Sequence, residues 1–429
     1  MSDPLTTMAS PHSEPDTSPR SMAWLIVGLL WVVAALNYLD RIMVTTMRDS
    51  LTAAIPMTDA QFGLLTSVFL WVYGLLSPFA GFLADRFNRS RLIIGSLFIW
   101  SVLTWLTGHA RSFEELIVAR ALMGASEAAY LPAALALITD YHRGPTRSLA
   151  TGIHMTGLSV GSALGGLGGW LAERHGWSAA FDVFGLCGIG YALVLVLMLK
   201  DAPRETAANV SATAPQPARL GEALRSLFGS GAFLLLLAFW SLLGVAGWAV
   251  IGWMPTYFKE SFHLDQGAAG ISATAYLYTA AMLGKLIGGA WADRWSRTQP
   301  RARILVPSLG LFIAAPAVLL VAQTNLLALG IAGLSIYGLT RAFSDANLMP
   351  VLCQISDPRY RATGYGVLNM FGTIVGGFTI YIGGAMRDAQ INVNTLFTIA
   401  AAGLLGCAVL LMWVKPNAPL IANADVDFR

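Results

Sequence analysis

Long apolar segments alternate with short polar segments along almost the whole chain. Twelve of the apolar segments have about 20 residues or more, the length at which an α-helix crosses the hydrocarbon core of a bilayer. The expected spans are residues 22–47, 61–84, 91–109, 113–140, 148–171, 179–199, 231–257, 268–292, 302–322, 325–351, 361–387 and 393–414. The pattern therefore predicts an all-α membrane protein with twelve transmembrane helices, which needs the lipid bilayer as its partner.

The longest polar interruption, residues 200–230, divides the expected helices into two sets of six. Asp85 and Asp293 lie 208 residues apart in similar segments, and Thr151 and Thr363 lie 212 residues apart. Two landmarks at nearly one offset indicate a duplicated six-helix unit, an organisation typical of transporters whose site lies between two halves. We expect an N-terminal bundle at 22–199, a linker at 200–230, a C-terminal bundle at 231–415, and tails at 1–21 and 416–429.

The distribution of basic residues predicts the orientation in the membrane. On the side of the N-terminus the chain carries eighteen Lys and Arg residues, against five on the opposite side. The positive-inside rule therefore places both termini in the cytoplasm, as expected for a bacterial inner-membrane protein. The first 21 residues are rich in Pro, Ser, Thr and acids, which predicts a disordered tail, and they lack the pattern of a cleaved signal peptide.

Composition and motifs exclude several classes of function. The net charge of +3 is explained by the basic residues that set the orientation, so no nucleic-acid partner is expected. A Walker-type loop and an H-E-x-x-H metal motif are both absent from the sequence. The cysteines, Cys187, Cys353 and Cys407, have no metal-type spacing and are expected to be small buried hydrophobes. We therefore expect no enzyme, no catalytic residue, no metal and no cofactor other than protons as a coupling ion.

Five segments resemble a known family. The string GFLADRFNRSR at 81–91 is similar to the helix 2–3 loop motif of the major facilitator superfamily, and GAWADRWSR at 289–297 is similar to its second-half copy. NYLDR at 37–41, ARALMGASEAAYLPA at 119–133 and WMPTYF at 253–258 resemble the organic anion branch, which includes hexuronate, galactonate and phthalate permeases. The resemblance implies the major facilitator fold and transport of a small organic anion by alternating access.

The loop motif suggests a gate. Gly81 allows two helices to approach closely, Asp85 is expected to interact with a helix N-terminus, and Arg86 is expected to pair with acids or lipid phosphates. Asp293 with Arg294 is the second-half counterpart. The alternative is a solvated turn that carries positive-inside arginines, which leaves the repeated acid unexplained.

Glycines recur at every fourth position in two of the expected helices. They are Gly157, Gly161, Gly165 and Gly169 in the fifth span and Gly284 and Gly288 in the eighth. Strips of this kind let helix backbones touch. We expect them to form the contact on which the two halves rock.

Charged residues lie well inside three of the expected spans: Asp40, Arg41, Arg120, Glu127, Arg341 and Asp345. Such residues are costly in a bilayer and usually face a partner or a cavity. Arg120 and Glu127 are seven residues apart, which places them on one helix face about 10 Å from each other. Arg41 is suited to bind a carboxylate, sulfonate or phosphate group, because its planar fork matches the oxygens of such an anion.

Proton coupling is expected from the same charges. Moving an arginine toward or away from a buried carboxylate changes how tightly the carboxylate holds a proton. We expect Arg120 to alternate between Glu127 and Asp40, and galactonate-type permeases have matching residues with these roles. The alternative is a set of static salt bridges, Asp40 with Arg120 or Arg41 with Glu127.

Several further residues are candidates for the substrate site. Asn37 and Tyr38 lie near the face of Arg41, with core packing as the alternative. His154 is suited to bind substrate or modulate coupling, or else to be a hydrogen-bonded interior histidine. Asn369 and Thr373 share a face and resemble a segment with polar contacts in relatives.

The second half contains a charged pair at helical spacing. Arg341 and Asp345 are four residues apart, so an ion pair within one helix is the simplest interpretation. In the alternative, Arg341 binds the far end of the substrate, which would suit a dianion or a polar tail.

Taken together, the sequence predicts a monomeric secondary transporter that imports a small organic anion by proton symport. A sugar acid, an aromatic acid, a short dicarboxylate and a sulfonate would all satisfy an arginine. The alternatives are a metabolite or drug exporter and a transporter-like sensor.

Overall fold

The computed structural model describes residues 20–142, 146–202 and 220–415, and these ranges contain only helices and loops. The side chains of residues 81–85 are not among those described. Residues 1–19 of the predicted N-terminal tail, the whole predicted C-terminal tail and most of the predicted linker fall outside the described residues, and their interpretation stays a prediction.

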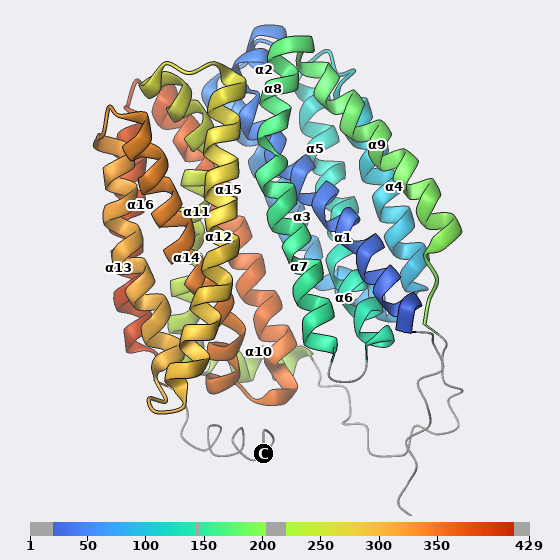
Figure 1. Cartoon of the computed structure of the whole chain (residues 1–429), viewed down its shortest axis with the longest axis vertical. Coiled ribbons are helices and arrows are strands. Elements are labelled where there is room, and N and C mark those ends of the chain that lie inside the picture. The colour runs from blue at the N-terminus through green and yellow to red at the C-terminus, as the bar shows by residue number, and fades with distance from the viewer. Residues whose placement is uncertain (1–19, 143–145, 203–219, 416–429) are drawn as a thin grey trace, which may run out of the picture.

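The described residues of the first half form a bundle on one side of the molecule (Figure 1). Its elements are α1 (Arg20–Met43), η1 (Val44–Thr46), α2 (Arg48–Ala54), α3 (Asp59–Arg86), α4 (Arg89–Thr107), α5 (Phe113–Glu127), α6 (Tyr130–Tyr141), α7 (Arg147–Leu164), α8 (Gly166–His175) and α9 (Trp177–Met198). Those of the second half form the other bundle. Its elements are α10 (Leu220–Phe228), α11 (Gly231–Phe262), α12 (Gln266–Ser296), α13 (Ala302–Gln323), α14 (Leu327–Ile355), η3 (Pro358–Tyr360), α15 (Arg361–Asp388) and α16 (Val393–Trp413).

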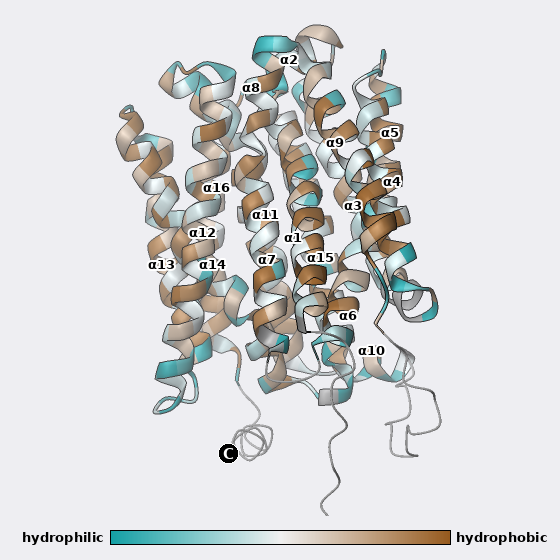
Figure 2. Ribbon diagram, turned by 45° about the vertical axis from the view of Figure 1, so that its right-hand side comes forward, coloured by the Kyte–Doolittle hydropathy of each residue, from teal (hydrophilic) through white to brown (hydrophobic). Residues whose placement is uncertain are grey.

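The predicted all-α fold with twelve spans is confirmed. Within the described ranges, ten helical segments are long and apolar enough to cross a membrane. The remaining two predicted spans correspond to α7 with α8 and to α12, which are rich in Gly, Ser and Thr. These helices pack against each other across the two halves, so they need fewer apolar side chains facing lipid. Figure 2 shows hydrophobic residues along the length of the helices and hydrophilic ones gathered at both ends of the bundle.

Two predicted spans are broken. In the fourth, α5 ends at Glu127 and α6 begins at Tyr130. Pro132 accounts for this break, because it has no N–H to donate to the carbonyl of Ala128. In the fifth, α7 gives way to α8 at Gly165. The first break leaves Glu127 at the C-terminal end of α5, well inside the span.

The two halves meet at the end of the bundle that carries α2, which we call the closed end; the end that carries α10 is the linker end (Figure 1). Here α3 packs along α15, and α7 with α8 packs along α12. Ser67 donates a hydrogen bond to the carbonyl oxygen of Gly377 (2.6 Å), and the Trp71 indole donates to that of Ile374 (3.1 Å). Gly74 of α3 also packs against α15, and this contact lies nearer the linker end than the two hydrogen bonds.

The glycine strips do not form the contact between the halves, and that expectation is wrong. The strip on α7 and α8 faces α1 and η1 of its own half, and the pair on α12 faces α14. Gly157, Gly161 and Gly169 meet Trp31, Ala35 and Thr46, whereas Gly284 and Gly288 meet Leu339 and Phe343. A four-residue spacing fixes which face of a helix is smooth, but not which neighbour that face meets. The contact between the halves uses other glycines, including Gly63 against Ile380 and Gly166 against Ile271.

Candidate functional site

The most unusual feature of the interior is a group of four charged residues in the first half. They are Asp40 and Arg41 at the end of α1 and Arg120 and Glu127 on α5, and we call them the central cluster. Their exposed fractions are only 1–3%. Because burying unpaired charge is costly, each member is expected to have a strong partner or a function.

Arg41 lies in an aromatic box. Its guanidinium carbon is 4.6 Å from the ring centre of Tyr38, 4.9 Å from that of Phe69 and 4.5 Å from that of Tyr73. Its Nη2 donates to Oε2 of Glu127 at 3.1 Å, which is the static pair that the sequence left open. The Arg41 Nε, by contrast, has no hydrogen-bond partner. The guanidinium is thus held by π-faces and one carboxylate oxygen, with part of its fork unused.

Arg120 pairs with neither carboxylate in this state. Its Nε donates to the Leu65 carbonyl oxygen at 3.2 Å and its Nη1 contacts the sulfur of Met123 at 3.7 Å. Its guanidinium also stacks on the ring of Phe69 at 4.7 Å, so one phenyl ring lies beside both arginines of the cluster. The Nη2 of Arg120 is buried without a partner. Its predicted alternation between Glu127 and Asp40 stays a prediction.

Asp40 is the least compensated charge of the cluster. Thr104 of α4 donates a hydrogen bond to its Oδ2 at 3.3 Å, and Oδ1 has no partner. Among the described residues, no cation forms a salt bridge with this carboxylate. The Asn37 amide nitrogen and Glu127 Oε1 are buried without partners as well. Unsatisfied donors and acceptors therefore converge where a ligand or a proton would satisfy them.

His154 is not brought to the central cluster. It is fully buried, with its ring 6.0 Å from that of Tyr130, and neither ring nitrogen has a hydrogen-bond partner. The Tyr130 hydroxyl donates to the carbonyl oxygen of Leu30. Leu30 precedes Arg41 by eleven residues, about 16 Å along α1, so His154 lies some three helical turns closer to the linker end.

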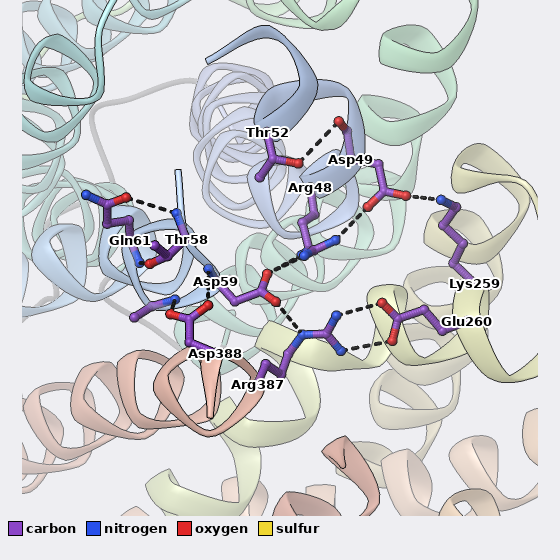
Figure 3. Close-up of polar contacts among 11 residues, drawn as sticks. Arg48, Asp49, Thr52, Thr58, Asp59, Gln61, Lys259, Glu260, Arg387 and Asp388 are labelled. Carbon is purple, nitrogen blue, oxygen red and sulfur yellow. Dashed lines mark hydrogen bonds and ion pairs between the residues drawn. The ribbon is translucent and has the colours of Figure 1, made fainter. Parts of the chain in front are cut away.

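A second group of charges joins the two halves at the closed end (Figure 3). It consists of Arg48, Asp49, Asp59, Lys259, Glu260, Arg387 and Asp388, and we call it the outer network. At its centre, Asp59 of α3 accepts hydrogen bonds from Arg48 of its own half (2.5 Å) and from Arg387 of the other half (3.0 Å). One carboxylate therefore ties an arginine from each half.

The other members extend these ties. Arg387 forms a bidentate pair with Glu260, with distances of 2.9 and 2.6 Å. Asp49 pairs with both Arg48 of its own half and Lys259 of the other. Asp388 accepts hydrogen bonds from the first two amides of α3, at 2.8 and 2.9 Å, and so caps that helix from the other half. Three members of the outer network, Arg48, Lys259 and Arg387, entered the sequence analysis only among the five basic residues on the side opposite the N-terminus. Pairing across the halves leaves no local pattern in the sequence, so their partners could not be predicted.

The family follows from the match between this chain and a family model. The model described as Major Facilitator Superfamily matches residues 30–298 and 242–425. The chain belongs to this superfamily. The resemblance found in the sequence is thus confirmed, and the protein is a multi-pass membrane transporter rather than an enzyme.

Relatives within the superfamily have several functions. A probable sulfoacetate transporter, SauU, from Cupriavidus necator is 25% identical over 410 residues, covering 91% of this chain and 94% of the relative. An MFS-type efflux pump from Mycolicibacterium smegmatis is 26% identical over 420 residues, covering 94% of each chain. A crystal structure of a bacterial homolog of the human lysosomal transporter Spinster, inward-facing and unoccupied, shares 24% identity and a TM-score of 0.75, covering 92% and 96% of the two chains. That last likeness shows the shared superfamily fold.

The superfamily loop motif lies at the linker end. The side chains of Gly81 and Asp85 are outside the described residues, so their predicted gating contacts stay predictions, as do those of Arg86. In the second half, Asp293 pairs with Arg303 of its own half at 3.2 Å. Arg294 lines, with Trp291 and others, a shallow hollow of about 640 Å³.

A string of the form G-x-S-x-G at 157–161 lies inside α7, without the strand and turn that a nucleophile elbow requires.

In the second half of this superfamily member, the predicted ion pair is confirmed. Arg341 Nη1 lies 3.2 Å from Oδ2 of Asp345, one turn along α14. Thr373 of α15 packs against Gly74 of α3, directly after Tyr73 of the aromatic box. Asn369 lies one turn closer to the linker end and is partly exposed.

Sequence reasoning named Tyr38 but missed the other two rings around Arg41. Phe69 and Tyr73 of α3 form two walls of the box around Arg41. The aromatic run FLWVY at 69–73 was the available signal, but such a run is more often core packing. Tyr365 of α15 is close enough to Tyr38 to interact with it electrostatically. The site is therefore more aromatic than the charged residues alone indicate.

Proposed function

We propose that this chain imports a small organic anion by proton symport across a bacterial inner membrane, with both termini in the cytoplasm. One observation carries the proposal. Arg41 is buried in an aromatic box with a single carboxylate partner, and its Nε is unused. A carboxylate or sulfonate that enters the box would replace the oxygen of Glu127 with the oxygens of a free anion.

Proton coupling follows from the displacement of Glu127. Once an anion takes its arginine, Glu127 would be a buried carboxylate without a cation, a state that binding of a proton relieves. Asp40 already lacks a paired cation and is the second candidate proton carrier. Substrate binding and proton binding would then favour each other, as symport requires.

A sulfonate or carboxylate is the proposed cargo. The relative from Cupriavidus necator is named as a probable sulfoacetate transporter, and sulfoacetate carries both kinds of group. The relative named as an efflux pump supports the rival direction, export, and a non-transporting sensor is the second rival. A cation exporter would need acids without arginines at this position, which the central cluster does not offer.

The test is uptake of labelled sulfoacetate into proteoliposomes with an imposed pH gradient, acidic outside. The wild-type protein is expected to accumulate the label. Glu127→Gln is expected to lose accumulation while it still exchanges labelled for unlabelled sulfoacetate, because the neutral side chain releases Arg41 but carries no proton. Glu222→Gln on α10 is the matched control, since Glu222 is an exposed carboxylate far from the cluster.

Three results would decide against the proposal. Accumulation by Glu127→Gln at the wild-type level would remove this residue from coupling. Efflux driven by an inward proton gradient would indicate an exporter. Binding without any exchange would indicate a sensor.

A further inference from the structure

The second half contains an arginine site that resembles the Arg41 site in its design. We propose that Arg341 binds a second anionic group of the substrate, so that the transported class is a compact dianion held between Arg41 and Arg341. This inference rests on the proposed function, because it assumes that Arg41 binds the first anionic group.

The Arg341 guanidinium is only partly engaged. Its Nη1 reaches the two oxygens of Asp345 at 3.4 and 3.2 Å, which are long distances for a charge-assisted pair. Its Nε is buried without a partner. The side chains of Arg341 and Asp345 are 21% and 24% exposed, against 4% for Arg41. The Nε edge of the fork therefore has no hydrogen-bond partner, while the ion pair as a whole is partly exposed.

A glycine makes room for this guanidinium. A Cβ atom at Gly247 of α11 would lie 3.1 Å from Nη2 of Arg341 and 3.4 Å from its Nε. The guanidinium therefore rests on bare backbone, and any larger side chain at this position would press on the free edge of the fork. The position of Gly247 is a feature of a fitted site rather than of a solvated ion pair.

Tyrosines connect the two arginine sites. Tyr278 of α12 is within electrostatic range of both Arg341 and Tyr38, and Tyr38 is a wall of the Arg41 box. Tyr365 of α15 likewise interacts with both Tyr38 and Asp345. Both sites therefore lie within electrostatic range of the same two tyrosines. Phenol hydroxyls add donors for the oxygens of a carboxylate or a sulfonate.

The balance of unsatisfied atoms favours acceptors at both ends of a ligand. Arg341 Nε is an unpartnered donor at one end. At the other end three donors lack a partner, those of Arg41 Nε, Arg120 Nη2 and the Asn37 amide, against two acceptors, Asp40 Oδ1 and Glu127 Oε1. Among the described residues around Arg341, no carboxylate oxygen is buried without a partner. A monoanion would leave one arginine unused, and a zwitterion would bring its cation toward Arg341.

The experiment compares four probes on the purified full chain by titration calorimetry: sulfoacetate and malonate as dianions, methanesulfonate as a monoanion and taurine as a zwitterion. We expect the wild-type protein to bind the dianions about 30-fold more tightly than methanesulfonate, as a charged hydrogen-bonded contact would provide. Arg341→Gln is expected to remove this difference and to leave methanesulfonate binding within about 2-fold of wild type.

A pair of glycine variants tests the site without deleting a charge. Gly247→Ala is expected to weaken dianion binding alone, because the new methyl group displaces the guanidinium. Gly28→Ala on α1 is the matched control, since a Cβ at Gly28 meets nothing within 4 Å. These variants keep the inference testable if Arg341→Gln fails to give a monodisperse protein.

The outcomes separate this inference from the proposed function. Dianion and monoanion binding that fall equally in Arg341→Gln, or that both ignore it, would overturn the inference and leave Arg41 as the anion site. Preferred binding of taurine, lost in Asp345→Asn, would overturn it in favour of a zwitterion. Binding of every probe that is unchanged in Arg41→Gln, or no binding of any probe, would overturn both proposals.

Discussion

The central cluster and the outer network contain similar residues but use them in opposite ways. In the outer network each charged side chain has a partner of opposite sign or a helix N-terminus. In the central cluster one salt bridge serves four charges, and Asp40 and Arg120 have no ionic partner among the described residues. Paired charges hold the two halves together, whereas buried charges without a partner are suited to bind a ligand or a proton.

Burial makes the contrast sharper. The six side chains that form the ion pairs of the outer network are 12–47% exposed, so water solvates part of their charge. Arg41 and Glu127 are 4% and 0% exposed, where a missing partner is far more costly. Under the proposed function, the outer network is therefore suited to break and re-form during transport, and the central cluster to respond to substrate and protons.

The largest expected effect comes from breaking the one pair in the central cluster. Arg41→Gln should reduce uptake to background and lower the free energy of unfolding by about 3 kcal/mol, because Glu127 is left buried without its cation. The double variant Arg41→Gln with Glu127→Gln should regain most of the stability but none of the uptake. Thermal unfolding and proteoliposome uptake measure the two effects. Uptake that returns with stability would mean that the pair is only structural.

A smaller effect is expected at the centre of the outer network. Asp59→Asn should release Arg48 and Arg387 from their shared carboxylate and open the closed end more often. The measurement is maleimide labelling of Ser67→Cys, placed at the buried contact between α3 and α15, after replacement of the native cysteines. We expect labelling to accelerate about 5-fold, which corresponds to about 1 kcal/mol for a partly exposed tie. Asp357→Asn at the linker end is the matched control, and equal acceleration there would contradict the role of the network.

The smallest expected effect concerns the cap across the halves. Asp388 accepts from the amides of Asp59 and Ala60 with one oxygen each, so Asp388→Asn keeps one of these two hydrogen bonds and removes the charge that favours the N-terminus of α3. Labelling of the same cysteine should accelerate by about 2-fold, the size of a helix-end charge effect. No change would indicate that a single neutral hydrogen bond is enough for this tie.

Local patterns in the sequence were enough for the spans and for the candidate charges. The apolar lengths predicted twelve helices, and the seven-residue spacing placed Arg120 and Glu127 on one helix that faces the cluster. The pair of Arg341 with Asp345 was predictable for the same reason, because both residues lie on one turn of one helix. Such features depend on the helical repeat and on the thickness of the bilayer, which do not depend on the rest of the fold.

Partners between helices were not predictable in this way. The glycine strips were assigned to the wrong neighbour, and Phe69 and Tyr73 were not recognised as walls of the Arg41 box. The outer network went unnoticed because its ties between the two halves join residues more than 200 positions apart.

By itself, the sequence determined how many times this transporter crosses the membrane and which buried charges require an explanation. Only the tertiary structure decided which charged residues pair with one another. Periodicity fixes the direction of a side chain relative to its own helix, but the neighbour it meets depends on how whole helices pack. Packing also decides that Arg41 is enclosed by rings while Arg387 is tied to Asp59, since both residues are simply arginines in the chain.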